Sequence, residues 1–257
     1  MSRRALTLAL LTIALLAIPG RAAAARWTPG HGTTWQVQFS GEIDLSVHAD
    51  TFDLDMFDTP ARRVRRLHSS GRHAVCYINA GAWENWRPDA GRYPSSVKGR
   101  DLDGWPGERW LDIRRLDVLA PILTGRLEIC SEKGFDGVEF DNVDGYQNAT
   151  GFDLSRSDQL AFNRWLAHAA HARGLAVGLK NALGIAQELE PDFDFAIVEQ
   201  CFYFHECGLT KPFVDARKSV VVIEYALARG AFCEKAARLG ISAMRKHRDL
   251  DAWRRPC

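Results

Sequence analysis

Short runs of apolar and β-branched residues recur along the chain, and most of them end abruptly in a charged or amide side chain. Runs of this length with polar residues at both ends are typical of buried strands in a parallel sheet. The pattern predicts strands at 35–39, 52–55, 75–79, 110–112, 138–141, 177–180, 195–199 and 220–224.

Helix-like stretches separate most of these strands. They lie at 60–70, 116–133, 157–173, 183–189 and 231–246. Several end at a glycine just before the next strand, as at Gly71, Gly134 and Gly174, because glycine accepts the left-handed conformation of a helix C-cap. Strands and helices that alternate in this way through one chain of this length favour a single-domain α/β fold, a (β/α)8 or TIM barrel, over an open sheet. The first unit is short, since residues 40–51 leave little room for a crossover helix.

The segment 80–109 interrupts this rhythm. It is rich in Gly, Pro, Trp and Arg and follows the end of a predicted strand. A loop of this length inside a compact domain is usually functional. In a barrel it would lie over the face that carries the active site.

The N-terminus has the features of a signal peptide. Arg3 and Arg4 precede an apolar stretch at 5–18, and small residues at 22–25 offer a cleavage site. The apolar stretch is short for a membrane span and polar sequence follows it. We therefore expect residues 1–25 to be removed, leaving a secreted domain at 26–257 without a stable membrane anchor.

The net charge of the chain bears on the kind of partner it could bind. The whole chain carries a formal charge of +1, and the predicted signal peptide contains three arginines, so the remainder is close to neutral, at −2. This balance indicates neither a nucleic-acid partner nor an anionic membrane surface. Nothing indicates an oligomer, and we expect a monomer.

All six cysteines follow residue 25, and an even number in an exported chain predicts disulfides. Cys201 and Cys207 could close a short loop, and Cys233 and Cys257 could tie down the C-terminal tail. Cys76 and Cys130 would then remain. Six cysteines allow fifteen pairings, and the sequence alone does not choose among them. Some of the thiols could also be free.

In a parallel α/β barrel the active site lies at the C-terminal ends of the strands. The residues at those ends are polar or charged: Asp55, Asn79, Asp112, Asp141, Lys180, Glu199 and Glu224. A single charged strand end is usually just solvated. Seven that meet at one mouth, with acids outnumbering the one lysine, predict a negative site suited to hydroxylated or cationic ligands.

The segment 134–146 carries the strongest signal. Because side chains alternate along a strand, Glu139 and Asp141 point to one side, which in a small barrel is the side that leads to the substrate. Asn142 and Asp144 lie on the loop beyond. The Asp-Asn-x-Asp run resembles part of a calcium loop, but the distal glutamate is absent, so we expect no metal and no cofactor.

Glu199 ends a strand two positions around the barrel from that of Asp141. Two carboxylates on facing strand ends are what cleavage of a glycosidic bond needs, one as nucleophile or base and one as proton donor. Aromatic side chains near strand ends could stack on sugar rings, although core packing is the default for each. They are Tyr77, Trp83, Trp86, Trp105, Tyr146 and Tyr225.

The ordered blocks of the chain resemble glycoside hydrolase family 114, the endo-α-1,4-polygalactosaminidase-like barrels. The matching blocks are 35–39, 76–81 with Trp83-Glu84, 107–113, 134–146, 178–181, 199–202 and 224–225. Phe140 departs from the proline or leucine expected there, which changes packing and leaves the carboxylates in place.

This resemblance implies an endo-acting hydrolase that cleaves α-1,4-linked galactosamine polysaccharide. Asp141 falls in the block with the nucleophile-like aspartate, and Glu199 falls in the block with the acid/base glutamate. The other matched residues would bind the substrate: Tyr77, Asn79, Trp83, Glu84, Asp112, Asn142, Asp144, Lys180, Asn181, Glu224 and Tyr225. Asp55, a strand-end acid outside these blocks, is a further candidate for substrate binding. Acidic groups among them could pair with sugar ammonium groups.

We predict a retaining mechanism for this hydrolase, although the stereochemical outcome depends on the distance between the two carboxyl groups. Two alternatives remain. One is a secreted polysaccharide-binding barrel without turnover. The other is an aldolase-like barrel that uses Lys180 as a Schiff-base nucleophile, which would require a lowered lysine pKa.

Overall fold

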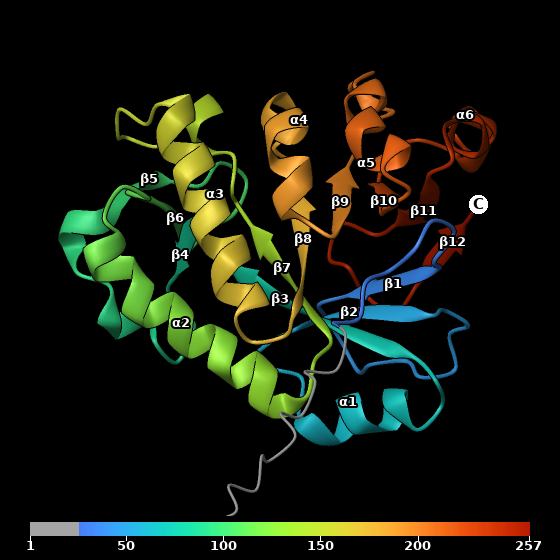
Figure 1. Ribbon diagram of the computed structural model, residues 1–257, viewed down its shortest axis with the longest axis horizontal. Helices are drawn as coiled ribbons and strands as arrows, with labels where there is room; N and C mark the ends of the chain where they lie inside the picture. Colours follow the sequence, from blue (N-terminus) through green and yellow to red (C-terminus); the bar gives the residue numbers. More distant parts are fainter. Residues whose placement is uncertain (1–25) are drawn as a thin grey trace, which may run out of the picture.

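The computed structural model describes residues 26–257, and the predicted signal peptide at 1–25 lies outside the described residues. Eight parallel strands form the central sheet, and one antiparallel strand extends its far edge (Figure 1). In spatial order these strands are β1 (Trp35–Gln38), β2 (Thr51–Asp55), β3 (His73–Asn79), β7 (Gly137–Asp141), β8 (Ala176–Lys180), β9 (Phe195–Glu199), β10 (Ser219–Glu224), β11 (Ser242–Lys246) and β12 (Arg254–Pro256).

The sheet curls into a nearly closed barrel with helices outside it (Figure 1). The helices are α1 (Ala61–His68), α2 (Leu116–Lys133), α3 (Arg156–His171), α4 (Ala186–Leu189), α5 (Lys211–Asp215) and α6 (Cys233–Leu239). Side chains of β11 bridge the seam to β1 and to the residues just before it: Lys246 donates to Gln36 Oε1 at 3.5 Å, and Ser242 donates to the carbonyl of Thr33 at 2.9 Å. The (β/α)8 prediction is confirmed.

Alternation along the strands produces two apolar layers. In β9, Phe195 and Ile197 belong to the cluster inside the barrel, and Val198 belongs to the cluster between the sheet and the helices. In β2, Phe52 and Leu54 face the helices, which leaves Asp53 and Asp55 on the inner side. Polar residues on the inner side of a strand therefore point toward the barrel axis.

Two of the predicted elements are wrong. The segment 110–112 is not a barrel strand, because β6 (Glu108–Leu111) belongs to a separate antiparallel sheet with β4 (Ala82–Glu84) and β5 (Lys98–Asp101). A short apolar run gives the same local pattern in either sheet. The predicted helix 231–246 ends at Gly240, where φ is +69°, and β11 follows it as the eighth parallel strand.

The long segment after β3 is thus an ordered insertion, and the absence of a helix at 40–51 agrees with the limited room there. Glycines after α1, α2 and before β8 have the expected left-handed conformation, with φ of +72° at Gly71, +86° at Gly134 and +74° at Gly174. The helices predicted at 60–70, 116–133 and 157–173 are confirmed, with α2 at the expected bounds.

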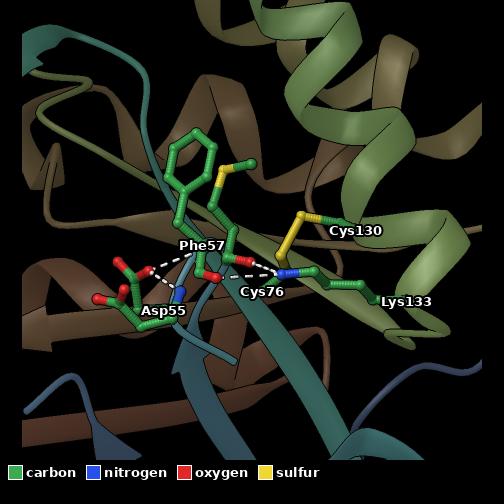
Figure 2. Close-up of a disulfide and its surroundings, with 7 residues drawn as sticks. Asp55, Phe57, Cys76, Cys130 and Lys133 are labelled. Atoms are coloured by element: carbon green, nitrogen blue, oxygen red, sulfur yellow. Dashed lines mark hydrogen bonds between the residues drawn. A yellow bond between two sulfur atoms is a disulfide. The ribbon is translucent and has the colours of Figure 1, made fainter. Parts of the chain in front are cut away.

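Three disulfides are present: Cys76–Cys130, Cys201–Cys207 and Cys233–Cys257. The first joins β3 to α2, and both of its cysteines are fully buried. Beside it, Lys133 at the end of α2 donates to the carbonyls of Met56 and Phe57 (Figure 2). Asp55 Oδ1 accepts from the backbone of Phe57 and Asp58, so the turn after β2 is fixed from both sides. Within residues 26–257, no helix is long and apolar enough to cross a membrane.

Candidate active site

A cavity of about 450 Å³ opens at the C-terminal ends of the parallel strands. The strand ends form its floor, and the inserted sheet and the loop after β11 contribute to its walls. Of the fourteen residues predicted to be catalytic or substrate-binding, nine line it: Asp55, Tyr77, Glu84, Asp141, Asn142, Asp144, Lys180, Asn181 and Glu199. The tertiary structure therefore brings the two candidate catalytic carboxylates to the same cavity.

Asp141, the last residue of β7, is held by three donors. Tyr77 Oη donates to Asp141 Oδ2 at 2.9 Å, and the backbone N–H of Asn142 donates to Oδ1 at 2.9 Å. Lys180 Nζ lies 3.3 Å from the same Oδ1. The side chain keeps about a fifth of its surface exposed, at 21%. These three donors fix the orientation of the carboxyl group, while its open side faces the cavity.

Glu199, the last residue of β9, is held by a different set of groups. Its Oε2 lies 3.5 Å from Lys180 Nζ, and Tyr225 donates its phenol proton to Oε1. The backbone N–H of Glu199 donates to Asn181 Oδ1 at 2.9 Å. Because Lys180 contacts both acids, it fixes the two carboxylates relative to each other.

The chain turns sharply after each of these three strand-end residues. Asn142, Asn181 and Gln200 follow Asp141, Lys180 and Glu199, and their φ angles are +59°, +49° and +59°. Left-handed conformations are costly for side-chain-bearing residues, and asparagine tolerates them better than most. Strained backbone of this kind clusters at functional sites, where it directs side chains.

Lys180 is the central cation of the site and is almost fully buried. Burial alone would lower the pKa of Lys180, but the carboxylates of Asp141, Glu139 and Glu199 raise that pKa well above its ordinary value. Glu139 Oε1 accepts from Nζ at 2.8 Å. The lysine is therefore a permanent ammonium at neutral pH.

A second group of acids lies on the inserted side of the cavity. Arg87 Nη2 lies 2.6 Å from Asp55 Oδ2 and 2.8 Å from Glu84 Oε1, so these two predicted residues share one guanidinium. Burial, together with the charges of Glu84 and Asp141, raises the pKa of Glu108 to about 7. Burial, followed by the charge of Asp141, raises the pKa of Asp144 to about 6. This part of the site holds protons that a cationic ligand could displace.

The other five of these fourteen residues do not line the cavity, for structural reasons, and neither does the aromatic candidate Tyr146. Asp112 binds Arg114 through both oxygens, at 2.7 and 2.8 Å. Glu224 points to the outer side of β10 and accepts from the backbone N–H of Phe202. Trp83 donates to the carbonyl of Ala90, and Lys98 covers its ring.

The other two support residues that do line it. Asn79 donates to Glu108 Oε2 at 2.9 Å, and it accepts from Asn142 Nδ2 at 3.0 Å. Tyr225 holds Glu199, as described above.

Sequence reasoning missed several residues of the cavity wall, above all Glu108. Alternation in β6 places Glu108 and Trp110 on one side of the strand, and this signal was missed because the predicted strand began at Trp110 and left Glu108 outside it. Trp86 and Trp105, which the sequence had offered as stacking rings, line the cavity with 54% and 45% of their surface exposed, and the guanidinium of Arg248 lies over the Trp105 ring.

One group of side chains in residues 26–257 has metal-ligand spacing: His247, Asp249 and Asp251, after β11. His247 Nδ1 and Asp251 Oδ2 are 3.0 Å apart, and the imidazole stacks on Trp253. These contacts account for the arrangement without an ion.

A parallel α/β barrel with two strand-end carboxylates around one lysine, above an open cavity with exposed tryptophans, defines a glycoside hydrolase of the TIM-barrel class. The sequence profile described as glycoside-hydrolase family GH114 matches residues 18–257. The chain therefore belongs to family GH114, as the sequence blocks indicated.

Solved structures agree with this assignment. The fold is similar to that of Ega3 from Aspergillus fumigatus, crystallised with galactosamine, with a TM-score of 0.86 and 37% identity over 93% of this chain and 100% of that one. It is also similar to the glycoside hydrolase domain of PelA from Pseudomonas aeruginosa, with a TM-score of 0.68 over 86% and 97% of the two chains. The second likeness, at 15% identity, concerns the fold alone.

An uncharacterized protein of Deinococcus radiodurans is 31% identical over 160 residues, which are 54% of this chain. The chain spans about half the length of this curated relative, 49% of which is matched.

Proposed function

We propose that this protein is a secreted endo-acting glycoside hydrolase that cleaves α-1,4-linked galactosamine polysaccharide with retention of configuration. Asp141 is the nucleophile and Glu199 is the acid/base. The observation that carries the proposal is the shared contact of both carboxylates with Lys180 Nζ, at 3.3 and 3.5 Å.

These two distances favour retention. Two oxygens that lie 3.3 Å and 3.5 Å from one nitrogen are at most about 7 Å apart. Retaining enzymes hold their carboxyl groups roughly 5–5.5 Å apart, and inverting enzymes need roughly 6.5–9.5 Å to admit a water molecule. The shared lysine leaves little of the inverting range.

The two carboxyl groups take different parts in the proposed reaction. Glu199 gives its proton to the glycosidic oxygen as that bond breaks, while Asp141 attacks the anomeric carbon and forms a glycosyl ester. Glu199 then removes a proton from water, which attacks the anomeric carbon and releases Asp141. Tyr77 and Lys180 orient Asp141 throughout, and Tyr225 orients Glu199.

A cationic sugar polymer suits the rest of the cavity. Glu84, Glu108 and Asp144 supply negative charge beside the reacting pair, and Trp86 and Trp105 offer exposed rings for stacking on sugars. Ega3, the neighbour with 37% identity, was crystallised with galactosamine, which supports the same substrate class here.

Secretion is supported by the predicted signal peptide and by the three disulfides, which persist in oxidising compartments. N-terminal sequencing of the exported protein should place its first residue after the small residues at 22–25.

The decisive experiment incubates the protein with partially deacetylated α-1,4-galactosamine polymer and sizes the products by mass spectrometry. We expect internal cleavage, new reducing ends and an α-configured first product by NMR. Asp141→Asn and Glu199→Gln should each lower kcat by about 1,000-fold or more, while the fold and sugar binding persist. Near-native turnover in Asp141→Asn would overturn the assignment, and binding without new reducing ends would favour a non-catalytic barrel.

The aldolase alternative is disfavoured by the charge on Lys180. Schiff-base formation needs a neutral amine, and the surrounding carboxylates raise the pKa of this lysine. Borohydride in the presence of carbonyl compounds should therefore leave Lys180 unmodified.

A further inference from the structure

Asp53 in β2 is fully buried inside the barrel. Its partners in register are Val37 on β1 and Val75 on β3, so neither flanking strand offers a donor side chain at that level. Neither carboxylate oxygen of Asp53 accepts a hydrogen bond from any donor in residues 26–257. An ionised carboxylate in such a position would lose its hydration without compensation.

The side chain of Glu139 in β7 is in hydrogen-bonding contact with Asp53. Glu139 is itself fully buried, its Oε1 accepts from Lys180, and its Oε2 lacks a donor within the described part of the chain. Two buried carboxyl groups that meet with no donor between them cannot both be ionised, so one proton lies between them.

The lysine determines which of the two acids holds this proton. Lys180 Nζ donates to Glu139 Oε1 at 2.8 Å, whereas no donor in residues 26–257 reaches either carboxylate oxygen of Asp53. The charged groups that face Asp53 are Glu139 and Asp141 from β7 and Lys180 from β8. Burial first, then Glu139, raises the pKa of Asp53 well above its ordinary value, and the opposing effect of Lys180 is smaller.

We propose that Asp53 is a positioning residue that acts as a neutral carboxylic acid, donating its proton in a hydrogen bond to Glu139 and so holding Lys180 between Asp141 and Glu199. This role rests on the proposed function, in which those two acids react with the sugar. Asp53 itself touches neither the cavity nor the substrate.

The arrangement has a consequence for the reaction. The charge of Asp141 disappears when it bonds to the sugar and returns on hydrolysis, so a lysine held by Asp141 alone would lose its partner. Glu139 stays in contact with Lys180 throughout, because Asp53 supplies the proton that makes the buried pair stable. An ionised Asp53 would add a second charge below the lysine and draw the ammonium away from the catalytic pair.

The protonation state can be read directly from the unmodified protein. Carbon-13 NMR of aspartate-labelled enzyme gives the carboxyl signal of Asp53, assigned by its loss in Asp53→Asn. We expect a protonated signal that does not titrate between pH 5 and 8. Asp50, whose pKa is lowered by hydrogen bonds from Thr34, supplies an ionised reference in the same spectrum. An ionised Asp53 signal at neutral pH overturns the proposal.

Two variants test the positioning role. Asp53→Asn keeps a neutral donor of the same shape, and kcat should stay within about threefold of the parent. Asp53→Leu removes the donor, and kcat should fall by up to about 100-fold with KM little changed, since small displacements of reacting groups are costly. Asp50→Asn is the matched control and should leave kcat unchanged.

A correctly folded Asp53→Asn enzyme that is as slow as Asp53→Leu would also overturn the proposal. Thermal unfolding separates this outcome from simple misfolding. The NMR measurement needs no substrate, so failure of the proposed function, seen as activity in Asp141→Asn, is distinguishable from failure of proton sharing at Asp53.

Discussion

Glu84 in β4 and Glu108 in β6 lie directly opposite each other in an antiparallel ladder at the wall of the cavity. Like charges at such a position repel each other. Arg87 binds Glu84 at 2.8 Å, and Asn79 donates to Glu108 at 2.9 Å, yet the pKa of Glu108 is still raised to about 7, by burial first. The pair therefore keeps a proton in the free protein and can exchange it for a cation.

We predict that Glu108 makes binding of the deacetylated sugar depend on pH. Glu108 is neutral below pH 7 and ionised above it, so affinity for cationic oligomers should rise as pH increases from 6 to 8. Glu108→Gln should lower that affinity by about tenfold at pH 8 and reduce its pH dependence. Calorimetry with galactosamine oligomers measures this effect, and fully N-acetylated oligomers are the control that should show no such change.

The same residue should make stability depend on pH, with a defined sign. The folded protein keeps the proton of Glu108 up to about pH 7, whereas an unfolded chain releases it near 4.5, so the free energy of unfolding falls between these values as pH rises. Glu108→Gln removes this loss. The variant should be more stable than the parent at pH 8 by roughly 1–3 kcal/mol and equal to it at pH 4, as measured by urea unfolding. An equal gain at both pH values would contradict the raised pKa.

Removal of the Tyr77 hydroxyl should slow the reaction without disturbing the fold. Tyr77 donates to Asp141 at 2.9 Å, so Tyr77→Phe is expected to lower kcat by roughly 10- to 100-fold. Tyr93 is a matched control, because its buried hydroxyl has no hydrogen-bond partner in the described structure. Tyr93→Phe should leave kcat unchanged. Equal effects of the two substitutions would show that the Asp141 contact is unimportant.

Removal of two of the disulfides should affect stability and activity to different extents. Cys76–Cys130 closes 54 residues and Cys201–Cys207 closes 6. Replacing both cysteines of a pair by alanine should lower the free energy of unfolding by about 4 kcal/mol for the first pair and about 2 kcal/mol for the second. Cys201 lies two residues after Glu199, so the second variant should lose more activity at a temperature where both are folded. Chemical unfolding and initial rates measure the two effects.

Asp112 and Asp144 offer a direct test of location. Both are acids that the sequence placed near the substrate, but only Asp144 lines the cavity. Arg114 donates hydrogen bonds to both carboxylate oxygens of Asp112. Asp144→Asn should raise KM for the cationic polymer by about tenfold, and Asp112→Asn should leave it within about twofold. A larger effect at Asp112 would contradict this placement.

Local sequence patterns predicted correctly those features that depend only on a residue's neighbours in the chain. The capped, apolar stretch of α2 was found at its observed bounds, and the alternation of Glu139 and Asp141 gave the inner side of β7. The same rule distinguishes the two neighbouring residues that the sequence had both assigned to the site, because it places Tyr225 on the inner side of β10 and Glu224 on the outer side. Each of these conclusions needs only the periodicity of a single element.

By itself, the sequence determined that parallel strands alternate with helices, that their ends are acidic, and that Asp141 and Glu199 belong to the site. Only the tertiary structure decided that β6 leaves the barrel while β11 completes it, that Glu108 faces Glu84, and that Asp53 meets Glu139 beneath Lys180. Strand partners and buried charge pairs join residues far apart in the chain, so their energies depend on distances and dielectric surroundings that exist only after folding.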